Sequence, residues 1–90
     1  SNISNRFFSA YLRFEVIDKS GVLSNITNIF SKNNVSIKRL IQTPNRRRNT
    51  SSIVIITHES KDFYLNRILK VVGRKTYIRK KPKLIRIDDN

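Results

Sequence analysis

The sequence predicts an α+β domain with a ferredoxin-like βαββαβ order, a four-stranded antiparallel sheet with two helices on one face. Three observations lead to this fold class. Two segments, 22–33 and 61–72, have apolar residues at the three- and four-residue steps of a helix, and the segments around them have the patterns of strands. The order is strand, helix, strand, strand, helix, strand. Right-handed crossovers place both helices on the same face of such a sheet.

Residues 7–17 form the first expected strand, because every second side chain in its central part is apolar. Its other face carries Tyr11 among charged residues, which indicates water or a second sheet on that side. The helix over 22–33 follows, and the paired Asn33 and Asn34 suit a left-handed cap at its C-terminal end.

A second strand is expected to begin at Val35, with a bulge or a change of face at Leu40 and Ile41. The segment 43–50 begins with turn-forming residues and contains nothing apolar, so it is expected to be a surface loop. The β-branched run within 52–58 then indicates an interior strand.

The second helix begins after Ser60, whose hydroxyl can cap it, and Gly73 is its expected terminator. The last extended segment covers 76–87. Pro82 lies inside this segment and removes a backbone donor. The segment is therefore either an edge strand or two pieces that separate at the proline.

One face of the expected sheet has no helix to cover it. The apolar side chains on this face are expected to be Tyr11, Ile17, Ile41 and either Ile53 or Val54. An uncovered apolar patch usually binds a partner.

Ninety residues make one small domain, expected at 7–88, with a linker or tag remnant at 1–6 and a tail at 89–90. Because the chain has no cysteine, it can form neither a disulfide nor a thiolate metal site, and nothing indicates an oxidising compartment. No apolar run approaches the roughly 20 residues that span a bilayer, and the N-terminus has no signal-peptide pattern. We therefore expect a cytoplasmic protein with no membrane partner.

The formal net charge is +13, and its distribution matters more than its sum. One basic cluster is Arg46-Arg47-Arg48, and a second extends from Arg74 to Lys83. Gathered on one face, the two clusters would attract nucleic acid or anionic lipid; the other interpretation is a solvated loop and an outer strand face. An RNA-recognition module would also need aromatic side chains on its third strand, which has none. The main interpretation therefore includes no nucleic-acid partner.

Few side chains in this chain could catalyse a reaction. His58 stands beside Glu59 at the end of a strand with no nucleophile or second imidazole near it, so it is expected to be structural or solvated. Asp18 lies in a turn and Asp88-Asp89 near the terminus, so no pair of carboxylates is set for acid and base chemistry. We expect no enzymatic activity, no cofactor and no metal in this chain.

The stretch Asp18-Lys19-Ser20-Gly21-Val22-Leu23 joins the first strand to the first helix, and Gly21 permits the sharp reversal. The first N–H groups of a helix have no intrahelical partners and carry partial positive charge, which makes a pocket for an anion such as a carboxylate. Two alternatives stay open. In the first, Gly21 is present only because the turn requires a residue without a Cβ, and no ligand binds. In the second, the Ser20 hydroxyl caps the N–H of Leu23 and competes with a ligand for this donor.

This turn, followed by Asn34-Val35-Ser36-Ile37 and by a strand ending in Thr57-His58-Glu59, resembles an ACT domain. More narrowly, the order of these segments and the closing Pro82-Lys83-Leu84-Ile85-Arg86-Ile87 are similar to the C-terminal ACT domain of bacterial homoserine dehydrogenase. The resemblance extends over about residues 8–87.

The resemblance implies regulation, because such domains pair with each other and bind a small amino acid at the interface between them. Threonine is the usual effector of homoserine dehydrogenase. By position, the resemblance implies that the N–H groups of residues 21–23 bind the effector carboxylate. Asn34 would contact the amino group or the side chain of the effector. Asp18 would hold the turn and contact the effector ammonium. Ser20 stands where such domains commonly have proline. The expected effector-binding residues are thus Asp18, Ser20, Gly21, Val22, Leu23 and Asn34.

The parent enzyme that the resemblance implies reduces aspartate semialdehyde with NADP or NAD, and its catalytic and cofactor domains are absent from this chain. We expect a homodimer that couples effector occupancy to that catalytic domain, as feedback control of aspartate-family amino-acid biosynthesis. One alternative is a dimerisation module with a vestigial ligand site. The other is a nucleic-acid-binding domain that uses Arg46, Arg47, Arg48 and the Lys80-Lys81 cluster.

Overall fold

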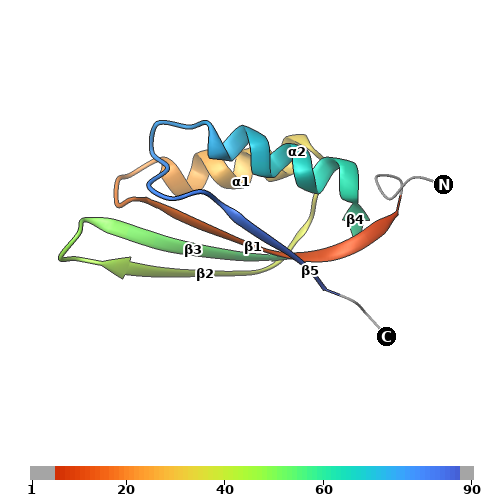
Figure 1. Ribbon diagram of the computed structural model, residues 1–90, viewed down its shortest axis with the longest axis horizontal. Helices are drawn as coiled ribbons and strands as arrows, with labels where there is room; N and C mark the ends of the chain where they lie inside the picture. The colour runs from red at the N-terminus through yellow and green to blue at the C-terminus, as the bar shows by residue number, and fades with distance from the viewer. Residues whose placement is uncertain (1–5, 88–90) are drawn as a thin grey trace.

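The computed structural model describes residues 6–87. The elements are β1 (Phe7–Ile17), α1 (Val22–Lys32), β2 (Ile37–Asn45), β3 (Thr50–Thr57), β4 (Ser60–Lys61), α2 (Asp62–Gly73) and β5 (Lys83–Ile87). Figure 1 shows the two helices side by side on one face of the sheet. Of the linker predicted at residues 1–6, only Arg6 lies within the described residues, and the predicted boundary at residue 88 and the tail at 89–90 lie outside them.

Strand β1 is the centre of an antiparallel sheet. It pairs with β3 over Tyr11–Ile17 and with β5 over Ser9–Arg13, and β2 pairs with the far side of β3. This arrangement confirms the predicted ferredoxin-like fold class. The two-residue strand β4, which pairs with Phe7 and Phe8 at the start of β1, was not predicted.

The core lies between the sheet and the helices. The predicted alternation of β1 is confirmed, since its even-numbered side chains from residue 10 to 16 are buried, and β3 buries its odd-numbered ones. The rings of Phe14 in β1 and Phe30 in α1 meet edge to face with centroids 6.3 Å apart. The apolar core consists of Ala10, Leu12, Phe14, Val16, Val22, Ile26, Ile29, Phe30, Val35, Ile53, Ile55, Leu65, Ile68 and Val72.

The surface loop that was predicted over 43–50 is shorter in the structure. The ladder between β2 and β3 continues to the pair Asn45 and Thr50, so only the four residues between them form the turn. Pro44 lies within the ladder, which is possible because β2 is an edge strand. The irregularity of β2 falls between Ile37 and Arg39 rather than at residues 40–41, and the strand begins at residue 37 rather than 35.

The predicted cap of the second helix is also wrong. The N-cap of α2 is Lys61, no side chain caps this end, and the helix begins at Asp62. Ser60 is used elsewhere, because it pairs with Phe8 in β4, and its hydroxyl donates to the carbonyl oxygen of His58 at 3.4 Å. Tertiary pairing has overridden the local capping preference of serine.

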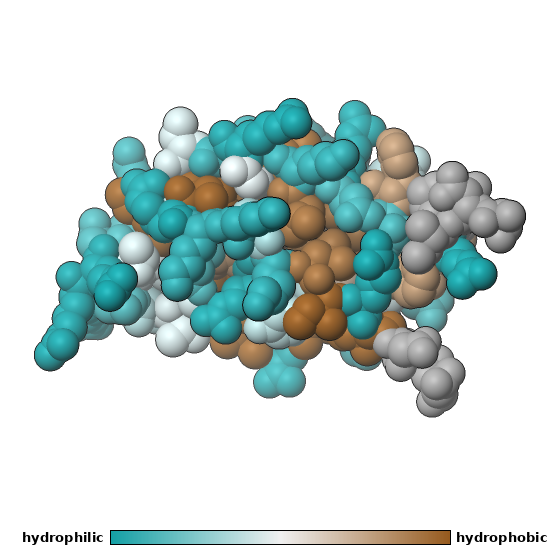
Figure 2. Space-filling view, viewed as in Figure 1, coloured by the Kyte–Doolittle hydropathy of each residue, from teal (hydrophilic) through white to brown (hydrophobic). Residues whose placement is uncertain are grey.

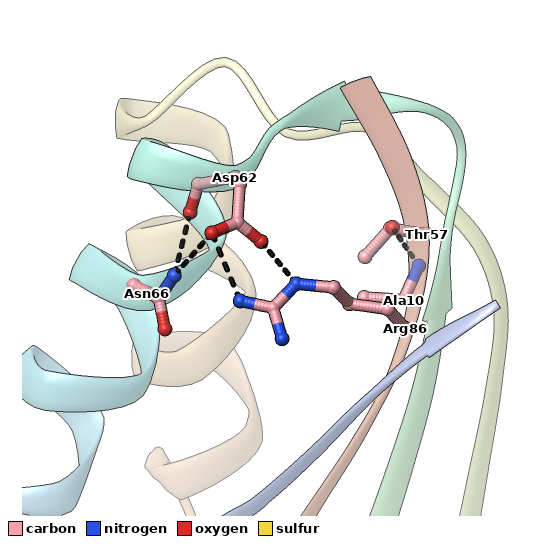
Figure 3. Close-up of polar contacts among 5 residues, drawn as sticks. All are labelled: Ala10, Thr57, Asp62, Asn66 and Arg86. Atoms are coloured by element: carbon pink, nitrogen blue, oxygen red, sulfur yellow. Dashed lines mark hydrogen bonds and ion pairs between the residues drawn. The ribbon is translucent and has the colours of Figure 1, made fainter. Parts of the chain in front are cut away.

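A buried ion pair ties the start of α2 to the last strand (Figure 3). Asp62 is 2% exposed, and its two carboxylate oxygens accept hydrogen bonds from Arg86 in β5. Asn66, one turn along α2, donates its side-chain amide to the same carboxylate at 2.8 Å. The guanidinium of Arg86 also lies over the ring of Phe8, 5.7 Å from its centroid. Both carboxylate oxygens of Asp62 have partners, so we assign this cluster a structural role.

The last segment consists of two pieces that separate at Pro82, one of the two predicted alternatives. Ile78 forms a single bridge with Val16, and the N–H of Arg79 donates to the carbonyl oxygen of Glu15 at 2.8 Å. The ladder with β1 resumes only at Lys83. Gly73 is the last residue of α2 and does not adopt a left-handed conformation; it packs against the ring of Pro82.

The face of the sheet opposite the helices is uncovered within residues 6–87. Tyr11 lies between Ile56 of β3 and Ile85 of β5 in the register of the sheet, and Val54 lies beside Ile41. The residue of β3 that faces this side is thus Val54, since Ile53 is fully buried on the helix side. Ile41 and Ile85 are 42% and 52% exposed, which leaves an apolar surface without a partner in the part of the chain that the structure describes.

Candidate anion-binding site at the start of α1

Gly21 caps α1 in a left-handed conformation with φ of 89°. A Cβ at this position would meet no heavy atom within 4 Å, so the backbone angle, and not crowding, requires glycine here. The first helical hydrogen bond runs from the N–H of Asn25 to the Gly21 carbonyl oxygen at 3.0 Å, and the N–H of Val22 makes a long turn contact of 3.4 Å with Lys19.

The first turn of α1 has no side-chain cap. The alternative in which the Ser20 hydroxyl caps Leu23 is therefore wrong. Within residues 6–87, no backbone or side-chain acceptor contacts the N–H of Gly21 or of Leu23. These donors, together with the positive end of the helix dipole, favour an anion.

The turn borders a surface hollow of about 580 Å³ between α1 and the segment that follows α2. Tyr77 forms one wall: its hydroxyl donates to Oδ1 of Asn25 at 2.6 Å, and its carbonyl oxygen accepts from the N–H of Ile17 at 2.9 Å. Burial raises the pKa of the Tyr77 hydroxyl, which keeps this group protonated as a donor. The lining residues are Ile17, Lys19, Ser20, Gly21, Val22, Asn25, Lys75, Thr76, Tyr77 and Arg79.

The hollow is positively charged. Lys19, Lys75 and Arg79 line it, and no carboxylate does. The guanidinium of Arg79 donates to the carbonyl oxygens of Thr76 and Ile78, at 2.8 and 3.1 Å, which fixes its position. The hollow therefore suits a ligand with a carboxylate or another anionic group.

The six predicted site residues do not all meet in one chain. Ser20, Gly21 and Val22 line the hollow, and Leu23 follows them in the same turn. The exposed Asp18 does not line the hollow; its N–H donates to the carbonyl oxygen of Asn49, and so holds the turn against the β2–β3 connection. The backbone makes this contact, so the role predicted for the Asp18 side chain stays a prediction.

Asn34 lies at the other end of α1. Its φ of 57° is the left-handed conformation expected at the asparagine pair, with Asn33 as the C-cap. It borders a separate hollow of about 540 Å³ that includes Thr27, Ser31 and Ser36. A ligand held by the Gly21 turn therefore cannot reach Asn34 of the same chain.

The lining residues that sequence reasoning missed include Asn25, Lys75, Tyr77 and Arg79. Asn25 could have been found, because it stands four residues after Gly21 and so faces the same side of the helix. The other three come from the segment after α2, and only tertiary structure brings them to this turn.

Known proteins resemble this chain in sequence and in fold. The sequence model of the ACT domain matches residues 10–74, most of the chain. The chain belongs to the ACT domain family. This ACT domain is 27% identical over 88 residues to a homoserine dehydrogenase of Bacillus subtilis (strain 168), and 30% identical over 80 residues to one of Neisseria gonorrhoeae (strain ATCC 700825 / FA 1090).

These matches include 97% and 89% of the ACT domain, but only 20% and 18% of the two relatives. The chain thus spans about a fifth of their length. Of the solved structures, a homoserine dehydrogenase from Thiobacillus denitrificans aligns with a TM-score of 0.86 at 22% identity, over 99% of the ACT domain and 19% of that chain. The ACT domain from GTP pyrophosphokinase of Chlorobium tepidum aligns with a TM-score of 0.68 at 17% identity, over 91% and 100%. The structural matches show the shared fold.

None of the helices in residues 6–87 is long and apolar enough to cross a membrane.

Proposed function

We propose that this ACT domain is the amino-acid-binding regulatory part of a homoserine dehydrogenase, and that it controls the enzyme by feedback in aspartate-family biosynthesis. Two relatives that match nearly the whole chain are homoserine dehydrogenases, which supports this parent. The single observation that carries the ligand proposal is the uncapped turn at Gly21, which opens into a positively charged hollow. The effector carboxylate binds the N–H groups of residues 21–23, and threonine is the first candidate.

The proposed site is complete only in a homodimer. Because Asn34 borders a different hollow from Gly21, an interface that brings the Gly21 end of one copy to the Asn34 end of the other is needed for both to contact one effector. The exposed Ile41, which lies beside Val54 at the β2 side of the uncovered sheet face, supports self-association through that side. Effector binding then acts on the catalytic domain, which would bind NADP or NAD, by favouring one arrangement of the two copies over another.

Isothermal titration calorimetry with L-threonine, followed by L-serine, L-isoleucine and L-lysine, tests the ligand. Two or three charge-assisted hydrogen bonds, less the entropy of immobilising the ligand, lead to a dissociation constant on the order of 1 mM or somewhat below. We expect Asn34→Ala to weaken effector binding. Glu59→Ala changes an exposed residue outside the proposed site, so this control should leave binding unchanged. If none of the four amino acids produces heat or a thermal shift at about 10 mM, the ligand proposal is wrong.

Sedimentation equilibrium separates the regulatory proposal from a vestigial module. A dimer that binds none of these amino acids is the result that the dimerisation-module alternative requires. For the full-length parent, we expect threonine to inhibit the NAD(P)-dependent oxidation of homoserine, and Gly21→Ala to relieve this inhibition while catalysis without threonine is retained.

A further inference from the structure

Two basic segments that are far apart in the sequence lie side by side in the fold. One is the β2–β3 turn, Arg46–Asn49, and the other is the segment 79–83 before and at the start of β5. Arg48 from the first, and Arg79 and Lys80 from the second, line one hollow of about 750 Å³. Figure 2 shows hydrophilic side chains over the end of the molecule where the β2–β3 turn lies in Figure 1. The fold therefore brings cations of both segments to one hollow.

Lys80 and Lys81 lie in a break of the ladder beside Pro82, which has no N–H to donate. The backbone of Arg79 is bonded to Glu15 of β1, and the ladder then stops until Lys83. Both intervening lysines are exposed and lie outside any strand. Their ammonium groups are thus free to contact a partner.

Acidic side chains do not neutralise this surface. Within residues 6–87, the ion pairs are Arg13 with Glu15 and Arg86 with Asp62. Glu15 is the one carboxylate among the lining residues, and Arg13 occupies it at 2.9 Å. Arg48, Lys80, Lys81 and Lys83 therefore form no ion pair in the described part of the chain, although the charge of Lys80 acts on the nearby Glu15.

An aromatic side chain lies beside these cations. The adjoining hollow, of about 430 Å³, is lined by Lys80, Lys81 and Lys83 together with Tyr11 and Ile85 of the uncovered sheet face. A positively charged groove next to an accessible aromatic ring is the combination that binds single-stranded nucleic acid, with phosphates on the cations and a base on the ring.

We propose that Arg48, Lys80, Lys81 and Lys83, with Tyr11, form a binding surface for single-stranded nucleic acid. This function is separate from the proposed effector site. The surface offers ammonium and guanidinium groups to phosphates but few groups that could read base edges, so its sequence preference is weak. A duplex keeps its bases stacked and offers none to Tyr11, so single strands bind more tightly.

Fluorescence anisotropy with a labelled single-stranded RNA of about 12 nucleotides and mixed sequence tests the surface. With four cations on phosphates, the logarithm of the binding constant should fall with the logarithm of salt concentration with a slope of about −3. We expect Lys80→Glu/Lys81→Glu to weaken binding by at least about tenfold at about 150 mM salt. Tyr11→Leu should weaken it by at least about fivefold with an unchanged slope.

The matched control is Lys32→Glu/Lys38→Glu, which changes the net charge equally at the opposite end of the molecule, and circular dichroism checks the fold of each variant. We expect this control to weaken binding less than about threefold, because salt screens distant charges. Equal weakening by both double variants would overturn the proposal and leave only attraction to the net charge. Equal affinity for a duplex of the same length, or for inorganic polyphosphate, would overturn it as well. None of these outcomes bears on whether threonine binds, because calorimetry with threonine tests the effector site separately.

Discussion

The guanidinium of Arg86 in β5 donates two hydrogen bonds to the carboxylate of Asp62, at 2.6 and 2.9 Å, and so fastens the last strand to the first turn of α2. The two residues are 24 positions apart in the sequence. The carboxylate also accepts from Asn66, and the acid stands in the first turn of a helix, where a negative charge is favourable. The contact gives α2 its position relative to the sheet.

Asp62→Ala should lower the free energy of unfolding by about 2 kcal/mol. Removing one member of a buried ion pair is strongly destabilising, but Arg86 is 39% exposed and regains part of its hydration. Urea denaturation at neutral pH measures the change. Glu59→Ala is the control and should stay within about 0.5 kcal/mol. A loss no larger than that of the control would contradict the structural role of this pair.

Thr57→Val should cost about 1 to 3 kcal/mol, although valine has nearly the same shape. The buried Thr57 Oγ1 accepts a hydrogen bond from the N–H of Ala10 at 3.0 Å, and valine leaves that donor without a partner. Figure 3 shows this contact between β3 and β1. Thr57→Ser keeps the acceptor and serves as the comparison in the same urea experiment. Valine proving the more stable of the two would show that the hydrogen bond matters little.

Gly21→Ala should lower stability by about 1 to 2 kcal/mol, because an L-residue with a side chain is strained at a φ of 89°. The added methyl group meets no atom within 4 Å, so the fold is retained. Gly21→Asn should cost less, since asparagine tolerates the left-handed region better. Thermal unfolding of both variants tests this order, and equal losses would point to a cause other than backbone strain.

Gly73→Ala should stabilise the domain by about 0.5 to 1 kcal/mol. Gly73 lies within α2, where alanine is the better helix former, and its φ is not positive. The new methyl group would lie 3.5 Å from the Pro82 ring, an ordinary van der Waals distance. The melting temperature reports the gain, and a fall would mean that α2 and Pro82 are already packed too closely.

Glu15 should make stability depend on pH in the acid range. Burial by itself raises the pKa of Glu15, but hydrogen bonding to Arg13, the neighbouring Ser52 hydroxyl and the positive charges of Arg13 and Lys80 together hold it below the usual 4.5. The folded state binds the proton less well than the unfolded chain, so this contribution is present above pH 4.5 and is lost as the pH falls through the folded pKa. The stability difference between the natural chain and Glu15→Gln should therefore be largest near neutral pH and vanish in acid. A difference that stays constant between about pH 7 and pH 3 would be inconsistent with this pKa shift.

The periodic elements could be predicted from the sequence because their patterns are local. The boundaries of β1 followed from the alternation of its side chains, and those of α1 from its apolar stripe, with an error of one residue. Strand β2 was harder, since most of its residues are exposed and its apolar residues do not alternate, and its ladder with β3 determines where it ends. The same holds for Ser60, whose use in β4 depends on the distant Phe8.

The candidate site also has a part that the sequence predicts and a part that only the fold brings together. The Gly21 turn could be found because a glycine between a strand pattern and a helix pattern is typical of a sharp reversal with a positive φ. The wall formed by Tyr77 and Arg79 could not, because these residues follow a helix more than 50 positions along the chain and have no local pattern that points to Gly21. The separation of Asn34 from the turn could have been found, because the helix predicted over 22–33 already places Gly21 and Asn34 at its opposite ends.

The position of β1 between β3 and β5 also sets the order in which the domain can be made. Of the strands, β1 is synthesised first on the ribosome, yet its residues Tyr11–Arg13 obtain their second neighbouring strand only when β5 has emerged. Until then the nascent chain carries an open strand edge to which another chain can add. Translation must therefore deliver the final strand before this sheet is safe from aggregation.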